Sequence, residues 1–298
     1  MSNPCRALCA ERQIFPGVTH RLLVAGLLFV LSSTDGSDAS EVRSRSAVSR
    51  PAVDFHGFVN WDFRHRRKLK GWMATARVIQ GTLDQWYPGR LAHTVMENGT
   101  SAALHGFLHS LPTRAESELS VVYLASHQSP EGKWDFVQRK LEPLSTIAGD
   151  SNIPGHPVRM VIVDACYAAA FRRDPVWDSA WQSSFLFAAD ADEETQELNF
   201  RSPQPVDLGR RYPAATAWLN QHMGKGWDGK LSFLGFVWVQ TFVTSKGVPV
   251  SQDGWREFLR RCEQTAREFR QNADRRLASS VTFVALPTRG VPVRERRK

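Results

Sequence analysis

Beyond residue 51 the chain alternates short apolar segments with longer segments in which apolar residues recur every three or four positions. The strongest apolar segments, Leu119 to Ser126 and Val158 to Ala165, are nearly continuous, which is typical of strands buried on both faces of a parallel sheet. Further strands are expected at Ala52 to Asn60, Leu91 to Met96, Phe185 to Ala189 and Val281 to Leu286. Strands alternating with helices predict an α/β fold with a mostly parallel six-stranded sheet and helices on both faces.

Helical spacing marks several of the intervening segments. In Lys68 to Gln85 one face carries Leu69, Trp72, Met73, Ala76 and Ile79. Helices are also expected from Gly99 to Leu111, from Arg210 to His222 and from Gly254 to Leu277.

The first 51 residues differ from the rest. Residues 22–31, LLVAGLLFVL, follow Arg21 and precede the small residues Ser37 and Ala39, which is the layout of a secretory signal and too short to span a bilayer comfortably. We expect residues 1–39 to be a signal peptide and 40–51 a polar linker, which places the protein outside the cytoplasm, in the periplasm or secreted. The alternative is a buried first strand, with the protein then cytoplasmic.

Composition excludes several classes of protein. With 42% hydrophobic residues the chain is ordinary for a globular protein, and no apolar run reaches the roughly 20 residues of a membrane-spanning helix. Four cysteines exclude a disulfide scaffold, and the chain has no CxxC pair for a structural zinc site. Two of them precede residue 40, so a processed protein would keep Cys166 and Cys262.

The net charge of +8 includes basic clusters at residues 64–68 and 294–298. No zinc finger, aromatic RNA-binding pattern or basic heptad accompanies them, so a solvated basic face explains the charge best and no nucleic-acid partner is expected. An electrostatic binder of nucleic acid or of an anionic envelope polymer stays as a weaker alternative.

Two reactive side chains follow the two strongest strands. His127 comes directly after one and Cys166 directly after the other, 39 residues apart. Ligands of open parallel sheets bind beyond the carboxyl ends of the strands, so we expect both at one rim. A histidine there can act as the base for a cysteine nucleophile. The alternative is that Cys166 is a small buried hydrophobic residue.

The sequences YLASH, ending at His127, and VIVDACYA, around Cys166, resemble the corresponding strand ends of caspase-like cysteine peptidases, the group of caspases, metacaspases, legumains and gingipains. The resemblance extends more weakly from about Asp54 to Leu198, through FVNWDF, MENGTSAALHGFLHSL and FLFAADADEETQE. It implies a three-layer caspase-like peptidase domain at residues 52–290, followed by a basic tail at 291–298. The implied activity is cysteine endopeptidase on protein or peptide substrates, without a cofactor or metal.

The resemblance also implies roles for single residues. Cys166 would be the nucleophile and His127 the general acid/base, with the backbone N–H groups of Cys166 and Gln128 as the oxyanion hole. The group usually has glycine after the histidine, so Gln128 departs from the pattern. A catalytically degenerate domain that binds a partner protein is therefore the alternative function.

Acidic residues near the rim are candidates for substrate binding. Metacaspase-like relatives use an acid two residues before the cysteine to hold a basic P1 side chain, so the resemblance gives Asp164 that role and implies cleavage after Arg or Lys. The alternative is a carboxylate that anchors the strand end. Asp190 begins a further acidic cluster, with Asp192, Glu193, Glu194 and Glu197, which could extend an acidic subsite or bind calcium, or be a solvated helix start.

Three other patterns are expected to be structural. Gly224, Gly226 and Gly229 spell GxGxxG but follow a helix rather than a strand, which argues against a dinucleotide site. His105 and His109 lie four apart without a third metal ligand. Cys262 falls within an expected helix as a partly buried thiol.

Overall fold

The computed structural model describes residues 52–62, 69–113, 116–136, 141–143, 153, 156, 158–173, 184–201, 207–272 and 277–285. The predicted signal peptide, linker and basic tail lie outside these residues, as do both basic clusters and the end of the predicted domain.

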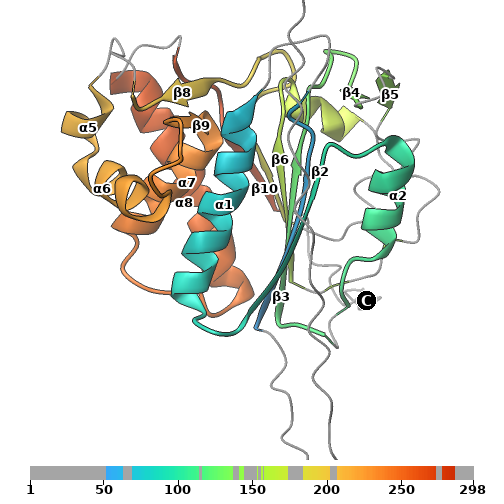
Figure 1. The fold of residues 1–298 in the computed structure, drawn as a ribbon, viewed down its shortest axis with the longest axis horizontal. Helices are drawn as coiled ribbons and strands as arrows, with labels where there is room; N and C mark the ends of the chain where they lie inside the picture. The colour runs from blue at the N-terminus through green and yellow to red at the C-terminus, as the bar shows by residue number, and fades with distance from the viewer. Residues whose placement is uncertain are drawn as a thin grey trace, which may run out of the picture. The chain divides into compact units, whose positions relative to one another are not determined.

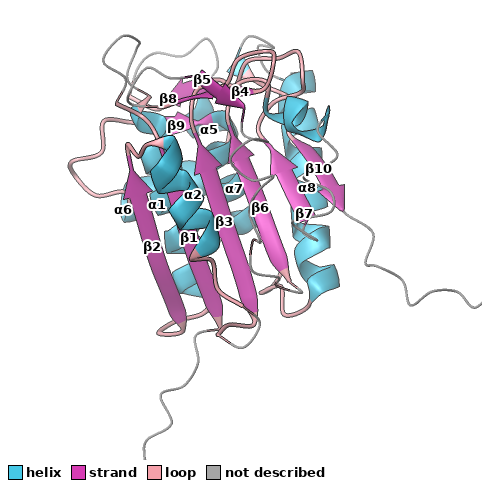
Figure 2. Cartoon of the chain, turned by 90° about the vertical axis from the view of Figure 1, so that its right-hand side faces the viewer, coloured by secondary structure: helices cyan, strands magenta, loops and turns pink. Residues whose placement is uncertain are grey.

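In the described part of the chain a six-stranded sheet forms the centre of the fold. Its order is β10-β7-β6-β3-β1-β2, and β10 alone runs antiparallel to its neighbour. The strands are β1 (Val53–Val59), β2 (Leu91–Glu97), β3 (Leu119–Ala125), β6 (Arg159–Asp164), β7 (Ser184–Phe187) and β10 (Thr282–Ala285). The predicted mostly parallel sheet is confirmed, and Figure 2 shows the strands side by side.

Helices cover both faces of this sheet (Figure 1). One face carries α1 (Lys70–Trp86), α6 (Pro213–His222), α7 (Phe233–Thr244) and α8 (Gln252–Asn272), and the other carries α2 (Ser101–His109) and a 3₁₀ segment, Ala168–Arg173. Successive residues of β6 point to opposite faces. Ile162 belongs to the larger hydrophobic core under α1 and α7, and Val163 to the smaller one under α2. This alternation explains why both central strands read as continuous apolar segments.

Helix α7 was not expected from the pattern of apolar residues. Every residue from Phe233 to Val239 is buried, so the helix has no polar face to reveal a 3.6-residue period. The predicted helix from Arg210 to His222 is two helices, α5 (Leu208–Arg211) and α6, separated by Tyr212. Tyr212 precedes Pro213 and is non-helical, with φ −127° and ψ 61°, because a proline ring disfavours the α conformation in the residue before it.

Four short strands were also not expected. They are β4 (Lys133–Asp135), β5 (Leu141–Pro143), β8 (Glu197–Asn199) and β9 (Lys230–Ser232), and they form two small antiparallel pairs. The pair β4–β5 lies at the carboxyl ends of the parallel strands (Figures 1 and 2). Three-residue strands are too short to show an alternating pattern in the sequence.

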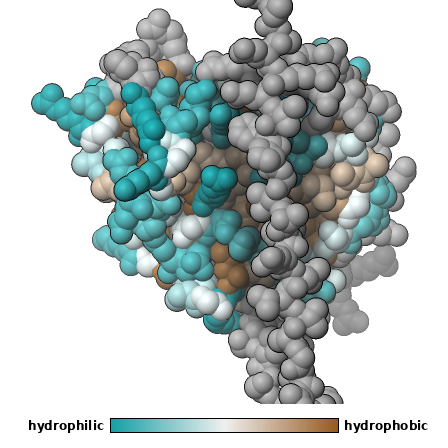
Figure 3. All heavy atoms as spheres, viewed as in Figure 1, coloured by the Kyte–Doolittle hydropathy of each residue, from teal (hydrophilic) through white to brown (hydrophobic). Residues whose placement is uncertain are grey.

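The outer surface over α1 and α6 is mostly hydrophilic, with apolar side chains showing in small patches (Figure 3). Among the described helices, none has both the length and the apolar character needed to cross a membrane.

Candidate functional site

The chain segments that follow β3 and β6 meet at the rim of the sheet. These strands are neighbours, and Ala125 pairs with Asp164 at their carboxyl ends. His127 and Cys166 therefore each lie two residues beyond a paired position. The residues that follow them are hydrogen-bonded directly, since Gln128 Nε2 donates to the carbonyl of Tyr167 at 3.0 Å. The fold thus brings His127 and Cys166 to the same edge of the sheet, beyond two neighbouring strands.

Cys166 is a free, partly buried thiol. Burial raises its pKa to about 11, and the nearby carboxylates of Glu194 and Asp164 act in the same direction, while a hydrogen bond from the Thr195 backbone opposes them. The resting group at neutral pH is therefore the thiol. Cys262 differs because it lies in the core of α8, fully buried, where burial raises its pKa to about 12. It is more buried than the sequence suggested.

His127 lies against an indole ring at the start of α1. Its ring contacts Trp72 edge-to-face, with centroids 5.4 Å apart, and its carbonyl accepts from the backbone N–H of Asp135 in β4 at 2.9 Å. The contact fixes the imidazole beside the rim. From the sequence Trp72 is only one apolar position on a helix face, and nothing there places it against a histidine 55 residues later.

The backbone N–H of Gln128 points away from the adjacent strand β4. Gln128 and Trp134 form an isolated antiparallel bridge whose two hydrogen bonds are made by the flanking residues, Asp135 to His127 and Ser129 to Lys133. In such a non-hydrogen-bonded pair the N–H of the central residue points outward from the ladder. The hairpin therefore leaves the N–H of Gln128 unused.

Asp164 is fully buried beneath the rim rather than exposed on it. Its Oδ2 accepts hydrogen bonds from the hydroxyl of Tyr123 at 2.8 Å and of Ser232 at 2.6 Å. Burial raises its pKa to about 6 against the effect of these two bonds. The carboxylate thus links the end of β6 to β3 through the hydroxyl of Tyr123 and to the start of α7 through the hydroxyl of Ser232. The expected anchoring of the strand end is made by side-chain hydroxyls and not by backbone groups.

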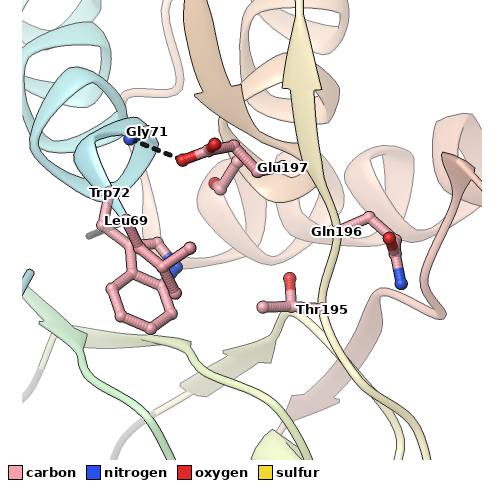
Figure 4. Close-up of a pocket in the computed structure, with 7 residues that line it drawn as sticks. Leu69, Gly71, Trp72, Thr195, Gln196 and Glu197 are labelled. Atoms are coloured by element: carbon pink, nitrogen blue, oxygen red, sulfur yellow. Dashed lines mark hydrogen bonds between the residues drawn. The ribbon is translucent and has the colours of Figure 1, made fainter. Parts of the chain in front are cut away.

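A small recess of about 20 Å³, with room for about one water molecule, lies between the start of α1 and the segment before β8. Leu69 and Trp72 lie on one side and Thr195 on the other (Figure 4). Its lining residues are Leu69, Gly71, Trp72, Thr195, Gln196, Glu197 and Ser232. Trp72 also touches the ring of His127, and the hydroxyl of Ser232 donates to Asp164. The recess therefore adjoins both the histidine and the buried carboxylate.

Two polar groups line this recess. The carboxylate of Glu197 accepts the backbone N–H of Gly71 at 3.0 Å and lies 3.7 Å from the ammonium of Lys230. Thr195 has a buried hydroxyl that makes no hydrogen bond to any described residue. The recess is thus lined by a carboxylate that is paired with Lys230 and by an unused buried hydroxyl.

The predicted acidic cluster is divided among separate partners. Asp190 accepts from the hydroxyl of Thr282 on β10 at 2.8 Å. Glu193 accepts from the backbone of Ser280 and pairs with Arg270, and Glu194 accepts from the hydroxyl of Tyr167. Within the described ranges no three His, Cys, Asp or Glu side chains converge as metal ligands would.

The remaining patterns make none of the contacts described above. The glycines at 224, 226 and 229 follow helix α6 rather than a strand, and Gly224 and Gly229 have φ of 73° and 85°. His105 and His109 are on α2 with their Nε2 atoms 3.2 Å apart.

Sequence reasoning missed three residues of the site besides Trp72. Ser232 belongs to a short strand that the pattern did not predict, and Thr195 follows β7 without a chemical signature. Tyr167 adopts φ 55°, a conformation no sequence rule assigns to tyrosine.

Comparisons of the chain with models of protein families and with curated proteins find no match.

Proposed function

We propose that residues 52–290 form a caspase-like cysteine endopeptidase domain, with Cys166 as nucleophile and His127 as general acid/base. The observation that carries the proposal is the pairing of β3 with β6, which sets the two residues at equivalent positions beyond neighbouring strands. The hydrogen bond between the next residues, Gln128 and Tyr167, supports it by holding the two segments together.

The proposed reaction uses these groups in order. Sγ of Cys166 attacks the carbonyl carbon of the scissile peptide bond while its proton passes to the imidazole of His127. The backbone N–H of Gln128, together with that of Cys166, stabilises the negative charge that develops on the carbonyl oxygen. His127 then gives its proton to the leaving amine, and the C–N bond breaks to leave a thioester. Water activated by His127 hydrolyses the thioester and regenerates the thiol.

The raised pKa of Cys166 determines when the proton moves. Because the resting residue is a thiol, His127 removes the proton while the sulfur attacks the substrate, and no thiolate is formed beforehand. A preformed thiolate would also be repelled by Glu194 and Asp164. The site is therefore expected to be inert until a substrate is bound.

The carboxylates beside the recess near His127 support a preference for cleavage after Arg or Lys. The recess has room for about one water molecule, so a P1 side chain would lie at its mouth, between Trp72 and Thr195 and near the carboxylate of Glu197. Asp164 lies behind Ser232, so its negative charge would act on a cationic side chain from below the recess. In this proposal both carboxylates act on the substrate through the electrostatic field.

The test is a cleavage-site profile on an unbiased peptide library, with the wild type beside Cys166→Ala and Cys262→Ala. We expect Cys166→Ala to abolish cleavage and thiol alkylation at that position, and Cys262→Ala to leave cleavage unchanged. The enzyme proposal fails if the wild type cleaves no peptide and Cys166 is alkylated no faster than the buried Cys262.

The second candidate is a catalytically degenerate domain that binds a partner protein at the same rim. The observation in its favour is the thiol pKa of about 11 beside two carboxylates. Binding of unmodified library peptides with equal affinity by the wild type and Cys166→Ala, without cleavage, would support it. Action outside the cytoplasm rests on residues 1–39 and stays a prediction.

A further inference from the structure

The side chain of Gln128 connects the two segments that carry the proposed reactive residues. Gln128 is buried, at 4% exposure, and its amide makes a hydrogen bond at each end. Oε1 accepts from the indole N–H of Trp134 at 2.8 Å, and Nε2 donates to the carbonyl of Tyr167 at 3.0 Å. An indole N–H can only donate and a carbonyl can only accept, so the amide has a single satisfying orientation.

The turn that this amide holds is strained. Tyr167 has φ 55°, in the left-handed region that residues with a Cβ rarely adopt. Its N–H donates to the carbonyl of Glu193 at 2.7 Å, and its own carbonyl accepts from Ala170 N–H at 2.8 Å as well as from Gln128. A backbone conformation of this kind persists only where surrounding contacts enforce it. Gln128 supplies the contact that comes from the His127 side of the rim.

Gln128 also contributes at the level of its backbone. The flanking residues make the hairpin hydrogen bonds, so its own N–H points away from β4. One residue therefore presents a backbone donor at the rim and, through its side chain, fixes the turn directly after the thiol. Any displacement of that turn changes the position of Cys166 relative to both the donor and His127.

We propose that Gln128 is a positioning residue, whose buried amide fixes the Cys166–Tyr167 turn against the His127 segment. The inference rests on the proposed function for its catalytic consequence, and on the hydrogen bonds alone for its effect on the thiol. Without the amide, Tyr167 would leave the left-handed conformation, Cys166 would become more accessible, and the attacking sulfur would lose its alignment.

The test substitutes Gln128→Met, which keeps an unbranched side chain of similar length and removes both hydrogen bonds. The rate of Cys166 alkylation by iodoacetamide at pH 8 should rise about fivefold or more. On the best library peptide, kcat should fall about tenfold or more with KM changed less than twofold. Gln221→Met, at an exposed position on α6, is the matched control and should change neither quantity.

A double-mutant cycle shows whether Gln128 acts through the turn. Glycine adopts φ near 55° without strain, so Tyr167→Gly should remove most of the effect of Gln128→Met on both quantities. If Gln128→Met is folded by circular dichroism and neither quantity changes, the inference is wrong, and it is equally wrong if the effect is undiminished in the Tyr167→Gly background. Should Gln128→Met not fold, Trp134→Phe, which removes the indole donor, is measured instead with the same expected directions.

Failure of the proposed function gives a different result. If the wild type cleaves no peptide but Gln128→Met accelerates alkylation and Tyr167→Gly suppresses that acceleration, the positioning role stands and the peptidase proposal fails. If the wild type cleaves peptides and Gln128→Met leaves kcat and alkylation unchanged, the peptidase proposal stands and the positioning role of Gln128 fails.

Discussion

At the scale of single residues, Asp164 is a buried carboxylate whose pKa lies close to neutrality. Its Oδ2 accepts from two hydroxyls, those of Tyr123 and Ser232, while burial raises its pKa from 3.8 to about 6. The folded state therefore binds this proton more tightly than the unfolded state. As a result, the contribution of Asp164 to the free energy of unfolding decreases as pH rises through the window from about 4 to 6.

Asp164→Asn should remove that pH dependence. Two pKa units correspond to on the order of 3 kcal/mol, so the free-energy difference between wild type and variant should change by up to about that amount between pH 4 and pH 7. Urea unfolding of both proteins at several pH values measures it. Parallel stability curves would show that Asp164 does not titrate in this window.

The same substitution examines specificity. If the negative charge below the recess attracts a basic P1 side chain, Asp164→Asn should lower kcat/KM for cleavage after Arg and Lys by about tenfold and spare other sites. Glu197→Gln should act in the same direction because Glu197 lines the recess itself. An equal loss at all cleavage sites would mean that the carboxylates only support the structure.

The pKa of Cys166 predicts how its alkylation depends on pH. Since the thiolate is the reactive form, the rate with iodoacetamide should rise about tenfold per pH unit from pH 7 to pH 10. Mass spectrometry of the modified peptide follows Cys166 separately from Cys262. A plateau below pH 9 would indicate a thiolate stabilised in the resting site, contrary to the burial and the neighbouring carboxylates.

At the scale of secondary-structure elements, the hydroxyl groups that cap α2 and α7 differ in the number of partners they have. At the start of α2, the hydroxyl of Thr100 accepts a capping hydrogen bond from Ala103 N–H at 3.1 Å. Ser232 accepts from Gly235 N–H at the start of α7 at 3.0 Å and also donates to Asp164 at 2.6 Å. Ser232 thus couples the start of a buried helix to the carboxylate at the end of β6.

Alanine at each cap separates the two contributions. Thr100→Ala should cost about 1 kcal/mol of unfolding free energy, as for a simple N-cap. Ser232→Ala should cost roughly 2–3 kcal/mol, because it also removes buried hydrogen bonds to the carboxylate of Asp164 and to the hydroxyl of Thr75. Denaturant unfolding at pH 7 measures both. Equal losses would mean that the bonds to Asp164 and Thr75 together contribute nothing to stability.

Elements with a clear polar face or alternation could be predicted from the sequence. Helix α1 shows apolar residues at helical spacing, and β3 and β6 are continuous apolar segments flanked by polar residues. Helix α7 could not be predicted in this way, because its burial on all sides removes the period. The proline at 213 was available as a helix-break signal, since the residue before it is pushed out of the α region.

At the scale of the whole molecule, the sheet separates two hydrophobic cores that share its strands. Leu83 on α1 is buried in the larger core and Leu104 on α2 in the smaller one. Because strands such as β6 contribute alternate residues to both cores, neither layer can lose its packing without exposing the sheet to water. We therefore expect one cooperative unfolding transition.

Leu83→Ala and Leu104→Ala examine this cooperativity. Each should lower the free energy of unfolding by about 2–5 kcal/mol and shift a single transition, whichever core it disrupts. Val250→Ala, at a residue 87% exposed, is the control and should change it by less than about 0.5 kcal/mol. Two separate transitions in Leu104→Ala, seen by fluorescence and by circular dichroism, would show that the α2 layer unfolds independently.

The sequence alone predicted the six strands of the central sheet and most of the helices, and it placed His127 and Cys166 directly after two buried strands. That was possible because hydrophobic periodicity and strand ends are local properties of the chain. The tertiary structure decided what surrounds those two residues: Trp72 against the imidazole, Gln128 between Trp134 and Tyr167, and Asp164 beneath Ser232. These contacts join positions up to 68 residues apart, so only the packing of helices on the sheet brings them together.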